Sequence, residues 1–591
     1  MRGKTIVYIA LFCFLFFSCQ SYDNRAWEIA KDCNNPELSK FLDYYKSGSD
    51  NEKYRAACFI VENMPNKSFI DPANYNLVKD IDIINADSLI MSLEYSFRLK
   101  DTQPAANYSF DQFCEYLLPY RVANEPLTYH WKWDCPRYAY PSEQSIFEIA
   151  KYINDQIHID IAPEYYREPI KSFASILSDK YGKCDDRTIF VAMVLRSMGI
   201  AAAYDCVPIW GSHNNGHSFT SVILPDNTCI SLSEQKQTTD SILFFRKVPK
   251  IYRYTYKSHN SSKYLVHSSF NNDRIDVTSS YDIPQQDIHL NQYTESANKS
   301  YLCVFLNGSW EPIAYSEDGH FSNLGTGELQ STESVDAGTG ILYLPIKYVA
   351  DQIVPISSPI VCSSKGIRSI EMLDEYESVT LYRKYPLNTR IVEFTKRMIR
   401  GVFEGSNKSD FSDAKTLHEI SKTPLPRIQV IKLDSLSKYR YIRYRRPKGI
   451  FSIAELNVKD ENGESLDFHA IGASAIEQSE RFPNVFDKNP LTYFEVNGGL
   501  DLWVGADMRK TRHIRYIEFA PRNDDNAISP GDIYELFYWD NAWISLGVQT
   551  AIDFSLTYDN VPKGALLWLR NLTKGIEERP FTYENGKQIW W

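Results

Sequence analysis

Lys180-Tyr-Gly-Lys-Cys-Asp-Asp-Arg-Thr-Ile-Phe-Val-Ala-Met-Val-Leu-Arg-Ser-Met-Gly-Ile200 is the most informative stretch of this sequence. Gly182 lets the backbone turn, and Gly199 is a natural end for a helix. Cys184 is therefore predicted in the first turn of a helix. There, the helix dipole and unpaired backbone N–H groups favour the nucleophilic thiolate. The apolar residues that recur at helical spacing are Ile189, Val191, Val194, Leu195 and Met198.

The segment after this helix predicts a strand followed by a hairpin. Residues 201–210 read as a strand, and residues 217–224, beginning with His217, read as a second one. Pro225-Asp-Asn predicts a turn, and residues 228–234 predict the returning strand. A helix and hairpin in this order can bring a thiol and an imidazole together, as cysteine nucleophiles require.

A Cys–His pair needs a third group that orients the imidazole. Asp226 lies at the predicted hairpin tip, and the strand from His217 to Leu224 spans about 23 Å at about 3.3 Å per residue. Asp226 is therefore too far away. The residue opposite His217 is expected near 233–236, where Glu234 is the best carboxylate and Ser233 and Gln235 are alternatives.

These residues resemble the transglutaminase-like superfamily of papain-type cysteine enzymes over about residues 100–245. The family pattern is a Gly-x-Cys that opens a helix, which is here Gly182-Lys-Cys184, and the helix ends in Met198-Gly-Ile-Ala-Ala202. His217-Ser-Phe219 resembles the family's His-x-aromatic strand. The family usually has Asp as the third member, whereas this chain offers Ser233-Glu234.

The resemblance implies a nucleophile at Cys184, a base at His217, an orienting Glu234 and no cofactor for catalysis. An upstream segment resembles one that precedes the core in bacterial lipoproteins of this superfamily. Its polar residues are expected to shape the cleft or an oxyanion site, or to form a buried salt bridge between two elements; they are Tyr120, Arg121 and Glu125.

The N-terminus has the features of a secretory signal peptide. Arg2 and Lys4 precede an apolar core from Ile6 to Phe17, which is too short to span a bilayer comfortably. The sequence Leu15-Phe-Phe-Ser-Cys19 resembles a relaxed lipobox of Gram-negative gut bacteria, with Cys19 as the lipidated residue. We therefore expect a lipid-anchored protein of the cell envelope, at the outer membrane, whose net charge falls from −11 to −13 when Arg2 and Lys4 are removed.

Composition narrows the class of function further. The acidic balance and the absence of a basic stripe argue against nucleic-acid binding. Nine cysteines remain besides Cys13 and Cys19, and they show neither Cys-x-x-Cys nor metal-site spacing. The 40 tyrosines and 11 tryptophans suit β-sandwich cores and sugar-stacking surfaces.

The 591 residues predict a multidomain α+β protein. Five segments are predicted: a signal peptide (1–19), a helical cap (20–100), the papain-like transglutaminase core (101–255), an Ig- or fibronectin-like β-sandwich region with a small β unit (256–425), and a second β-sandwich (426–591).

The last segment resembles a discoidin-like, galactose-binding-type β-sandwich. Asp487, Asn489 and Thr492 resemble the family loop that often holds a structural Ca²⁺, although an Asx-stabilised loop without metal fits the sequence equally well. Four aromatic residues suggest a sugar platform or, more simply, core or domain packing; they are Phe537, Tyr538, Trp539 and Trp543.

Two functions are therefore expected from the sequence. The first is an exported cysteine hydrolase or acyltransferase that acts on amide bonds of a peptide or glycopeptide through Cys184, His217 and Glu234. The alternative is a surface lipoprotein that binds glycan or peptide and carries a vestigial Cys–His core.

Overall fold

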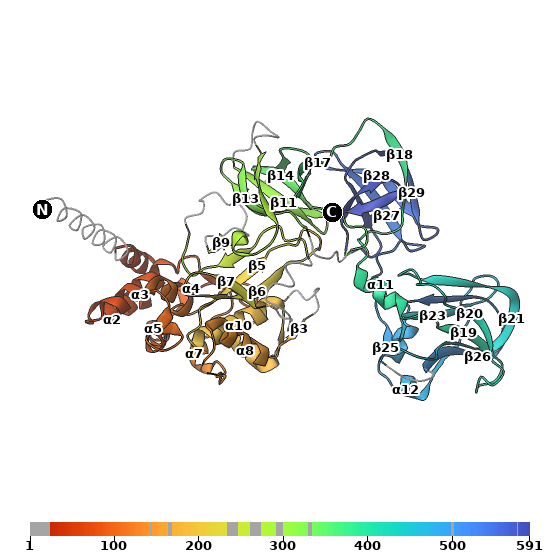
Figure 1. Cartoon of the computed structure of the whole chain (residues 1–591), viewed down its shortest axis with the longest axis horizontal. Coiled ribbons are helices and arrows are strands. Elements are labelled where there is room, and N and C mark those ends of the chain that lie inside the picture. The colour runs from red at the N-terminus through yellow and green to blue at the C-terminus, as the bar shows by residue number, and fades with distance from the viewer. Residues whose placement is uncertain are drawn as a thin grey trace. The chain divides into compact units, whose positions relative to one another are not determined.

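The computed structural model describes residues 24–141, 143–162, 168–232, 246–259, 273–290, 299–328, 334–350, 352–497, 502–575 and 577–591. The chain divides into two compact units, of which the first comprises Met1–Gln330 with Gly340–Ser369 and the second Ser331–Thr339 with Ile370–Trp591. Helices dominate the N-terminal part and strands the C-terminal part (Figure 1), so the predicted multidomain α+β class is confirmed. In the described part of the chain, no helix is both long and apolar enough to cross a membrane.

The N-terminal segment is helical, as predicted. Residues 24–32 form a helix, followed by α2 (Glu37–Lys46), α3 (Asn51–Glu62) and α5 (Ala86–Lys100). Side-chain caps start two of them, because Asp50 accepts from the N–H groups of Glu52 and Lys53, and Asn85 accepts from that of Ser88. The apolar faces of the helices share one core. A short hairpin, β1 (Ser68–Ile70) with β2 (Leu77–Lys79), and α4 (Asp80–Ile83) follow α3.

Short helical turns lead from this segment to the core of the first unit. They are a 3-10 turn (Ala105–Asn107), α6 (Phe110–Gln112), a π-helical turn (Phe113–Leu117), α7 (Trp131–Asp134), α8 (Ile146–Gln156) and α9 (Phe173–Asp179). Two-residue strands β3 (Asp160–Ile161) and β4 (Tyr181–Gly182) pair in parallel just before α10 (Cys184–Ser197). Almost every residue of α10 is buried, because other elements surround the helix.

An antiparallel sheet packs on α10. Its strands lie in the order β7 (Cys229–Leu232), β6 (His217–Ile223), β5 (Ala202–Val207), β8 (Tyr252–Tyr254) and β9 (Arg274–Asp276). The apolar side chains of α10 share a core with α8, α9 and one face of this sheet. Figure 1 shows α7, α8 and α10 together on one side of β5 and β6. The predicted helix, strand and hairpin are all present in the predicted order.

The rest of the first unit is built of strands. A sheet contains β12 (Ser309–Ser316), β11 (Ser300–Leu306), β14 (Ile341–Val349), β16 (Ile360–Ser363) and β17 (Gly366–Ser369), and β15 (Gln352–Pro355) pairs with β14. A pair formed by β10 (Gln285–His289) and β13 (His320–Gly325) shares its apolar core. This two-layer packing agrees with the expectation of a β-sandwich region.

The second unit contains two cores. The first lies under a sheet of β20 (Lys415–Glu419), β19 (Val402–Ser406), β21 (Gln429–Arg446), β26 (Leu502–Ala520) and β23 (Glu455–Lys459), with β24 (His469–Gly472) on β26. The pair β22 (Phe451–Ile453) with β25 (Phe494–Val496) supplies further core side chains. Helices α11 (Thr389–Lys396) and α12 (Ser474–Glu477) accompany these strands.

The second core lies between two other sheets. One has the order β28 (Trp543–Thr550), β27 (Ile533–Trp539), β30 (Leu567–Asn571), β31 (Pro580–Glu584) and β32 (Lys587–Trp590). The other pairs β18 (Tyr376–Leu381) with β29 (Leu556–Pro562). Apolar residues of both sheets form one shared core, of which Val379 is the first and Trp590 the last along the chain.

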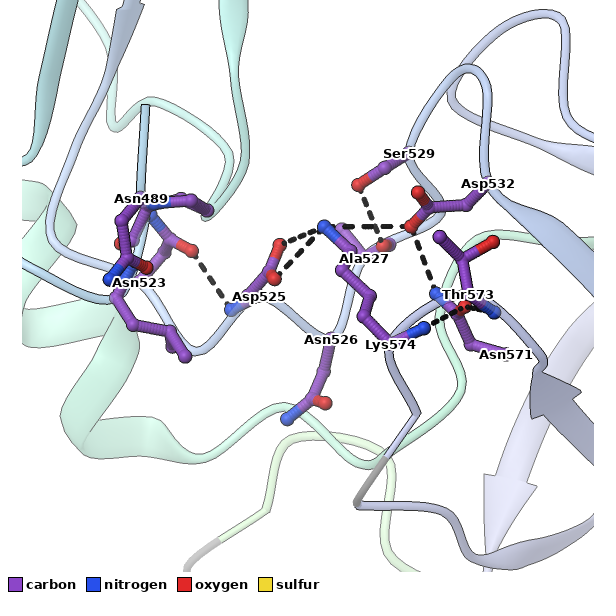
Figure 2. Close-up of polar contacts among 12 residues, drawn as sticks. Asn489, Asn523, Asp525, Asn526, Ala527, Ser529, Asp532, Asn571, Thr573 and Lys574 are labelled. Carbon is purple, nitrogen blue, oxygen red and sulfur yellow. Dashed lines mark hydrogen bonds and ion pairs between the residues drawn. The ribbon is translucent and has the colours of Figure 1, made fainter. Parts of the chain in front are cut away.

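A polar junction connects β26 to β27. The Lys574 ammonium lies 3.0 Å from the Asp525 carboxylate and 3.5 Å from that of Asp532, and Figure 2 shows the amine between these two acids. Asn571 donates to Asp532 at 2.9 Å, and Asn523 accepts from the Asp525 N–H at 2.9 Å. These contacts tie the linker between the two cores to β30 and the turn after it.

The observed pairing differs from the predicted boundary at 425/426. That boundary separates β19 and β20 from β21, although β19 pairs with both β20 and β21. The predicted segment 426–591 also lacks β18, which pairs with β29. Sequence patterns mark the individual strands here, but not which distant strands share a core.

We predict that residues 370–591 fold in isolation, whereas residues 440–591 do not. The shorter segment lacks core residues of both sandwiches, including Leu381 and Phe403, which are fully buried. Circular dichroism during heating should show cooperative unfolding for 370–591 and a broad or absent transition for 440–591. A sharp transition of 440–591 at the same temperature would contradict this assignment of the cores.

Candidate functional site

Cys184 is the first residue of α10, as predicted from the sequence. It is half-buried. Lys183 precedes it as the N-cap, and its N–H donates to Oδ2 of Asp186 at 2.8 Å. Oδ1 of the same carboxylate accepts from the N–H of Lys171 at 2.7 Å. The buried Asp186 thus fixes the chain on both sides of β4 and positions the first turn that carries the thiol.

Gly182 makes this arrangement sterically feasible. A Cβ at this position would lie 2.7 Å from Cβ of Asp186, which is closer than real Cβ contacts. The glycine of the Gly-x-Cys pattern therefore provides space for the Asp186 carboxylate, in addition to allowing the turn expected from the sequence.

A second acid of the same turn connects α10 to the sheet. Asp185 Oδ1 accepts hydrogen bonds from the Tyr204 hydroxyl at 2.5 Å and from the hydroxyl of Ser218. Tyr204 belongs to β5 and Ser218 to β6. The carboxylate next to Cys184 is therefore attached to the strand that begins with His217.

His217 is the first residue of β6, and its ring is enclosed by aromatic residues. It stacks with Trp210 at 6.0 Å between centroids and with Phe219 at 5.9 Å. Burial lowers the pKa of His217 to about 4, and the positive charges of Arg246 and Arg187 add to the effect, whereas Asp185 opposes it. The imidazole is therefore neutral at neutral pH, and it lies within electrostatic range of the first turn of α10.

Successive residues of β6 face opposite sides of the sheet. Ser218 and Thr220 face the helix, since Thr220 donates to the carbonyl of Thr188. His217 and Phe219 alternate with them and lie on the other face, where Phe219 belongs to a separate core. Cys184 and His217 thus lie at the same end of the helix–sheet layer, but the contacts described for them do not join the two side chains directly.

The hairpin after His217 agrees with the distance argument from the sequence. The strands β6 and β7 pair from Thr220 with Leu232 to Ile223 with Cys229. Asp226 lies in the turn, where its carboxylate accepts from the Thr228 N–H at 2.9 Å. The candidates for the third member, Glu234, Ser233 and Gln235, lie outside the described residues, as does Cys19.

The upstream polar residues form a buried network around Asp80. Tyr120 donates to Oδ2 of Asp80 at 2.8 Å, and Arg121 forms an ion pair with the same oxygen. Arg121 also donates to the carbonyl of Glu125 at 2.9 Å, and the Glu125 carboxylate accepts from the N–H groups of Val122 and Ala123. These contacts correspond to the buried salt bridge considered from the sequence, and they connect the 120–125 segment to α4.

In the second unit, hydrogen bonds within the 487–492 loop hold it in shape. Asp487 accepts from the Asn489 N–H at 2.9 Å and from the Thr492 hydroxyl at 2.8 Å. Close by, Glu455 of β23 is buried, and its Oε1 has no hydrogen-bond partner among the described residues. Burial raises the pKa of Glu455 to about 8, and the neighbouring Asp487 carboxylate adds to this effect.

The aromatic run in the last sheet splits between its two faces. Trp539 and Trp543 contact each other edge to face at 5.0 Å, and Phe537 stacks on Trp568 at 5.2 Å. Tyr538 instead packs against the second core of this unit. The aromatic run therefore lies partly in a core, in agreement with the simpler interpretation of the sequence, which was core or domain packing.

Sequence reasoning did not identify several of these residues. Asp185, Tyr204, Ser218 and Arg246 surround the candidate site, and only Asp185 carries a sequence signal, its position beside Cys184. Glu455 is a single acid in a strand and has no local pattern that marks it. None of the nine cysteines of the described residues forms a disulfide bond, and within the same residues no group of three or more His, Cys, Asp or Glu is arranged to hold a metal.

Comparison with protein-family models gives a match within the first unit. Residues 137–232 match the family model described as the transglutaminase-like superfamily. A search of curated proteins found no match for the chain. The matched segment runs from just before α8 to the end of β7 and includes both Cys184 and His217. This region of the first unit therefore has a transglutaminase-like core, which is a fold of the cysteine-protease and acyltransferase type.

Proposed function

We propose that this protein is a cysteine hydrolase or acyltransferase that acts on amide bonds of peptides or glycopeptides. The position of Cys184 at the start of α10 carries the proposal, because the family match covers this helix start and the strand that begins with His217. A helix N-terminus supplies backbone N–H groups and a positive dipole, both of which favour a reactive thiolate and a developing oxyanion.

In the proposed reaction, Sγ of Cys184 attacks the carbonyl carbon of the amide. His217 takes the thiol proton and returns it to the leaving amine as the C–N bond breaks. The resulting thioester passes its acyl group to water or to an amine, which restores the thiol. Glu234 is proposed to orient the imidazole, with Ser233 and Gln235 as alternatives.

The lowered pKa of His217 determines how this base works. A neutral imidazole at neutral pH is able to accept the thiol proton during attack, and it does not hold a positive charge beforehand. Asp185, next to Cys184, acts on the charge of His217, which is consistent with an imidazole near the start of α10. Catalytic hydrogen bonds are often long or misaligned before substrate binds, and they tighten in the complex.

A binding function is the second candidate, and the position of the same ring favours it. His217 stacks between Trp210 and Phe219, and both of these side chains belong to a core other than that of α10. In that case the Cys–His core is vestigial, and the β-sandwiches capture a glycan or a peptide.

Under either function, we propose a lipid anchor at Cys19 that tethers the protein to the cell envelope, with no role for nucleic acid.

We predict that Cys184→Ala and His217→Ala each lower amide cleavage or transfer by at least about a thousandfold, because each removes an essential group. A peptide and glycopeptide library read by mass spectrometry provides the assay. Asp226→Ala is the matched control, since this residue lies at the hairpin tip. Iodoacetamide should also modify Cys184 faster than the eight other described thiols. Unchanged turnover in Cys184→Ala would exclude an enzymatic role for Cys184 and favour the binding function.

The charges around His217 predict opposite shifts of the pH profile. The base must be neutral, so kcat/KM should fall as the pH drops through about 4. Arg246→Gln removes a positive charge, so it should raise the pKa of His217 and move this fall in kcat/KM to higher pH. Asp185→Asn removes a negative charge and should move it to lower pH. Equal or absent shifts in the two variants would mean that His217 is not the base.

For the second unit, we propose a structural Ca²⁺ held by Asp487 and Glu455, while Asn489 and Thr492 shape the loop. The partnerless Oε1 of Glu455 supports this proposal, since a buried carboxylate beside a second one is costly without a cation or a proton. Oxygen ligands of this kind suit Ca²⁺. When bound, the ion would neutralise both acids and lower the pKa of Glu455.

We predict that Ca²⁺ raises the melting temperature of the protein and that Glu455→Gln removes most of this effect. The pKa of Glu455 rises from 4.5 to about 8 on folding, so without Ca²⁺ the stability should fall as the pH rises through this window. Glu455→Gln should abolish that dependence. Glu464→Gln, at an exposed position, is the control. An equal Ca²⁺ response in Glu455→Gln would rule out the site.

A further inference from the structure

Lys384 places a buried amine inside the second unit, shortly after β18. The residue is 2% exposed. Its Nζ donates to Oδ1 of Asn526 and to the backbone carbonyl of Glu577, in each case at 2.8 Å. The backbone N–H of Lys384 also donates to the carbonyl of Asn526 at 3.0 Å. Main chain and side chain together therefore hold the amine against the carboxamide of one asparagine.

The other end of this carboxamide contacts an acid. Nδ2 of Asn526 donates to Oε2 of the half-buried Glu577 at 2.8 Å. Asn526 itself is 2% exposed, and its side chain points away from the ammonium of Lys574 (Figure 2). An amine, a carboxamide and a carboxylate thus follow one another in a site that excludes most water.

These surroundings favour the nucleophilic form of the amine. Burial lowers the pKa of Lys384, and four nearby acids oppose this shift without cancelling it; they are Glu578, Glu577, Asp525 and Asp524. A desolvated lysine amine is a recognised nucleophile toward carbonyl carbons. The hydrogen bond to Oδ1 keeps Nζ near the carbonyl carbon Cγ, which is one bond from that oxygen. Such fixed proximity replaces an encounter between two separate reactants.

We propose that Lys384 and Asn526 react with each other to form an intramolecular isopeptide bond, with Glu577 as the proton carrier. The neutral Nζ of Lys384 attacks Cγ of Asn526. Both nitrogens are then bonded to Cγ, so the Glu577 carboxylate that contacts Nδ2 is able to take a proton from Nζ and pass it to Nδ2. The Cγ–Nδ2 bond breaks and ammonia leaves. One amine and one primary amide thus give one secondary amide and ammonia, without an oxidant or a cofactor.

The bond would join two distant parts of the second unit. Lys384 follows β18, and Asn526 belongs to the linker between β26 and β27, 142 residues further along the chain. A covalent link over such a distance restricts the unfolded chain, as a disulfide bond does, and thereby stabilises the folded state. It would fasten the linker between the two cores to the strand pair of the second one.

Mass spectrometry of the denatured full chain tests the proposal. A tryptic digest should contain a branched peptide in which the Lys384 and Asn526 segments are joined, and the intact mass should be lower by one ammonia. Succinimide formation at an asparagine also releases ammonia but gives no branched peptide, so sequencing of the peptide by tandem mass spectrometry decides. A wild-type chain without the branched peptide would overturn the proposal.

Variants test the role of each group. Lys384→Arg and Asn526→Ala should each lack the branched peptide, because each removes a reacting group. Glu577→Gln keeps a hydrogen-bond acceptor but cannot carry the proton, so it should slow bond formation by at least about a hundredfold. Lys563→Arg, an exposed lysine of the same unit, is the control and should cross-link like the wild type. Full cross-linking in Glu577→Gln, with the fold intact by circular dichroism, would overturn the role of Glu577.

Discussion

The buried carboxylate of Asp186 holds the start of α10 in place, and the candidate site depends on it. Its two oxygens accept from the N–H groups of Lys171 and Lys183, so one side chain joins the loop before α9 to the turn before α10. Burial raises the pKa of Asp186, and these two hydrogen bonds oppose that shift. Without them a buried acid would be destabilising, and the turn that carries Cys184 would lose its anchor.

The same turn couples the helix to the sheet through Asp185. Its carboxylate binds the hydroxyls of Tyr204 and Ser218, which belong to neighbouring strands. The hydrogen bond to Asp185 shows that Ser218 faces α10. Because side chains alternate along a strand, the neighbouring His217 belongs to the opposite face of β6. The geometry that stabilises the helix start therefore also places the imidazole among aromatic rings. The same carboxylate acts on the charge of His217, so the start of the helix and the start of the strand are electrostatically coupled.

Much of the local structure around the site is predictable from residue patterns. The apolar spacing after Cys184, with Gly182 before it and Gly199 after it, predicts α10. The turn at Pro225–Asn227 predicts the hairpin, and the observed pairing of Ile223 with Cys229 agrees with it. Strand boundaries in the second unit are also readable, but β18 and β29 are more than 170 residues apart and no sequence pattern connects them. The domain boundaries were therefore the least predictable feature.

The sequence by itself determined that Cys184 begins a helix, that His217 begins a strand and that Asp226 lies at a distant turn. Each of these depends on spacing between near neighbours, which local hydrogen bonds and side-chain periodicity control. The tertiary structure alone decided that Asp185 binds Ser218, that Glu455 lies beside Asp487, and that Lys384 donates to Asn526. These contacts depend on which strands pair and which faces pack. No local pattern encodes that choice, which depends instead on burial of the whole core.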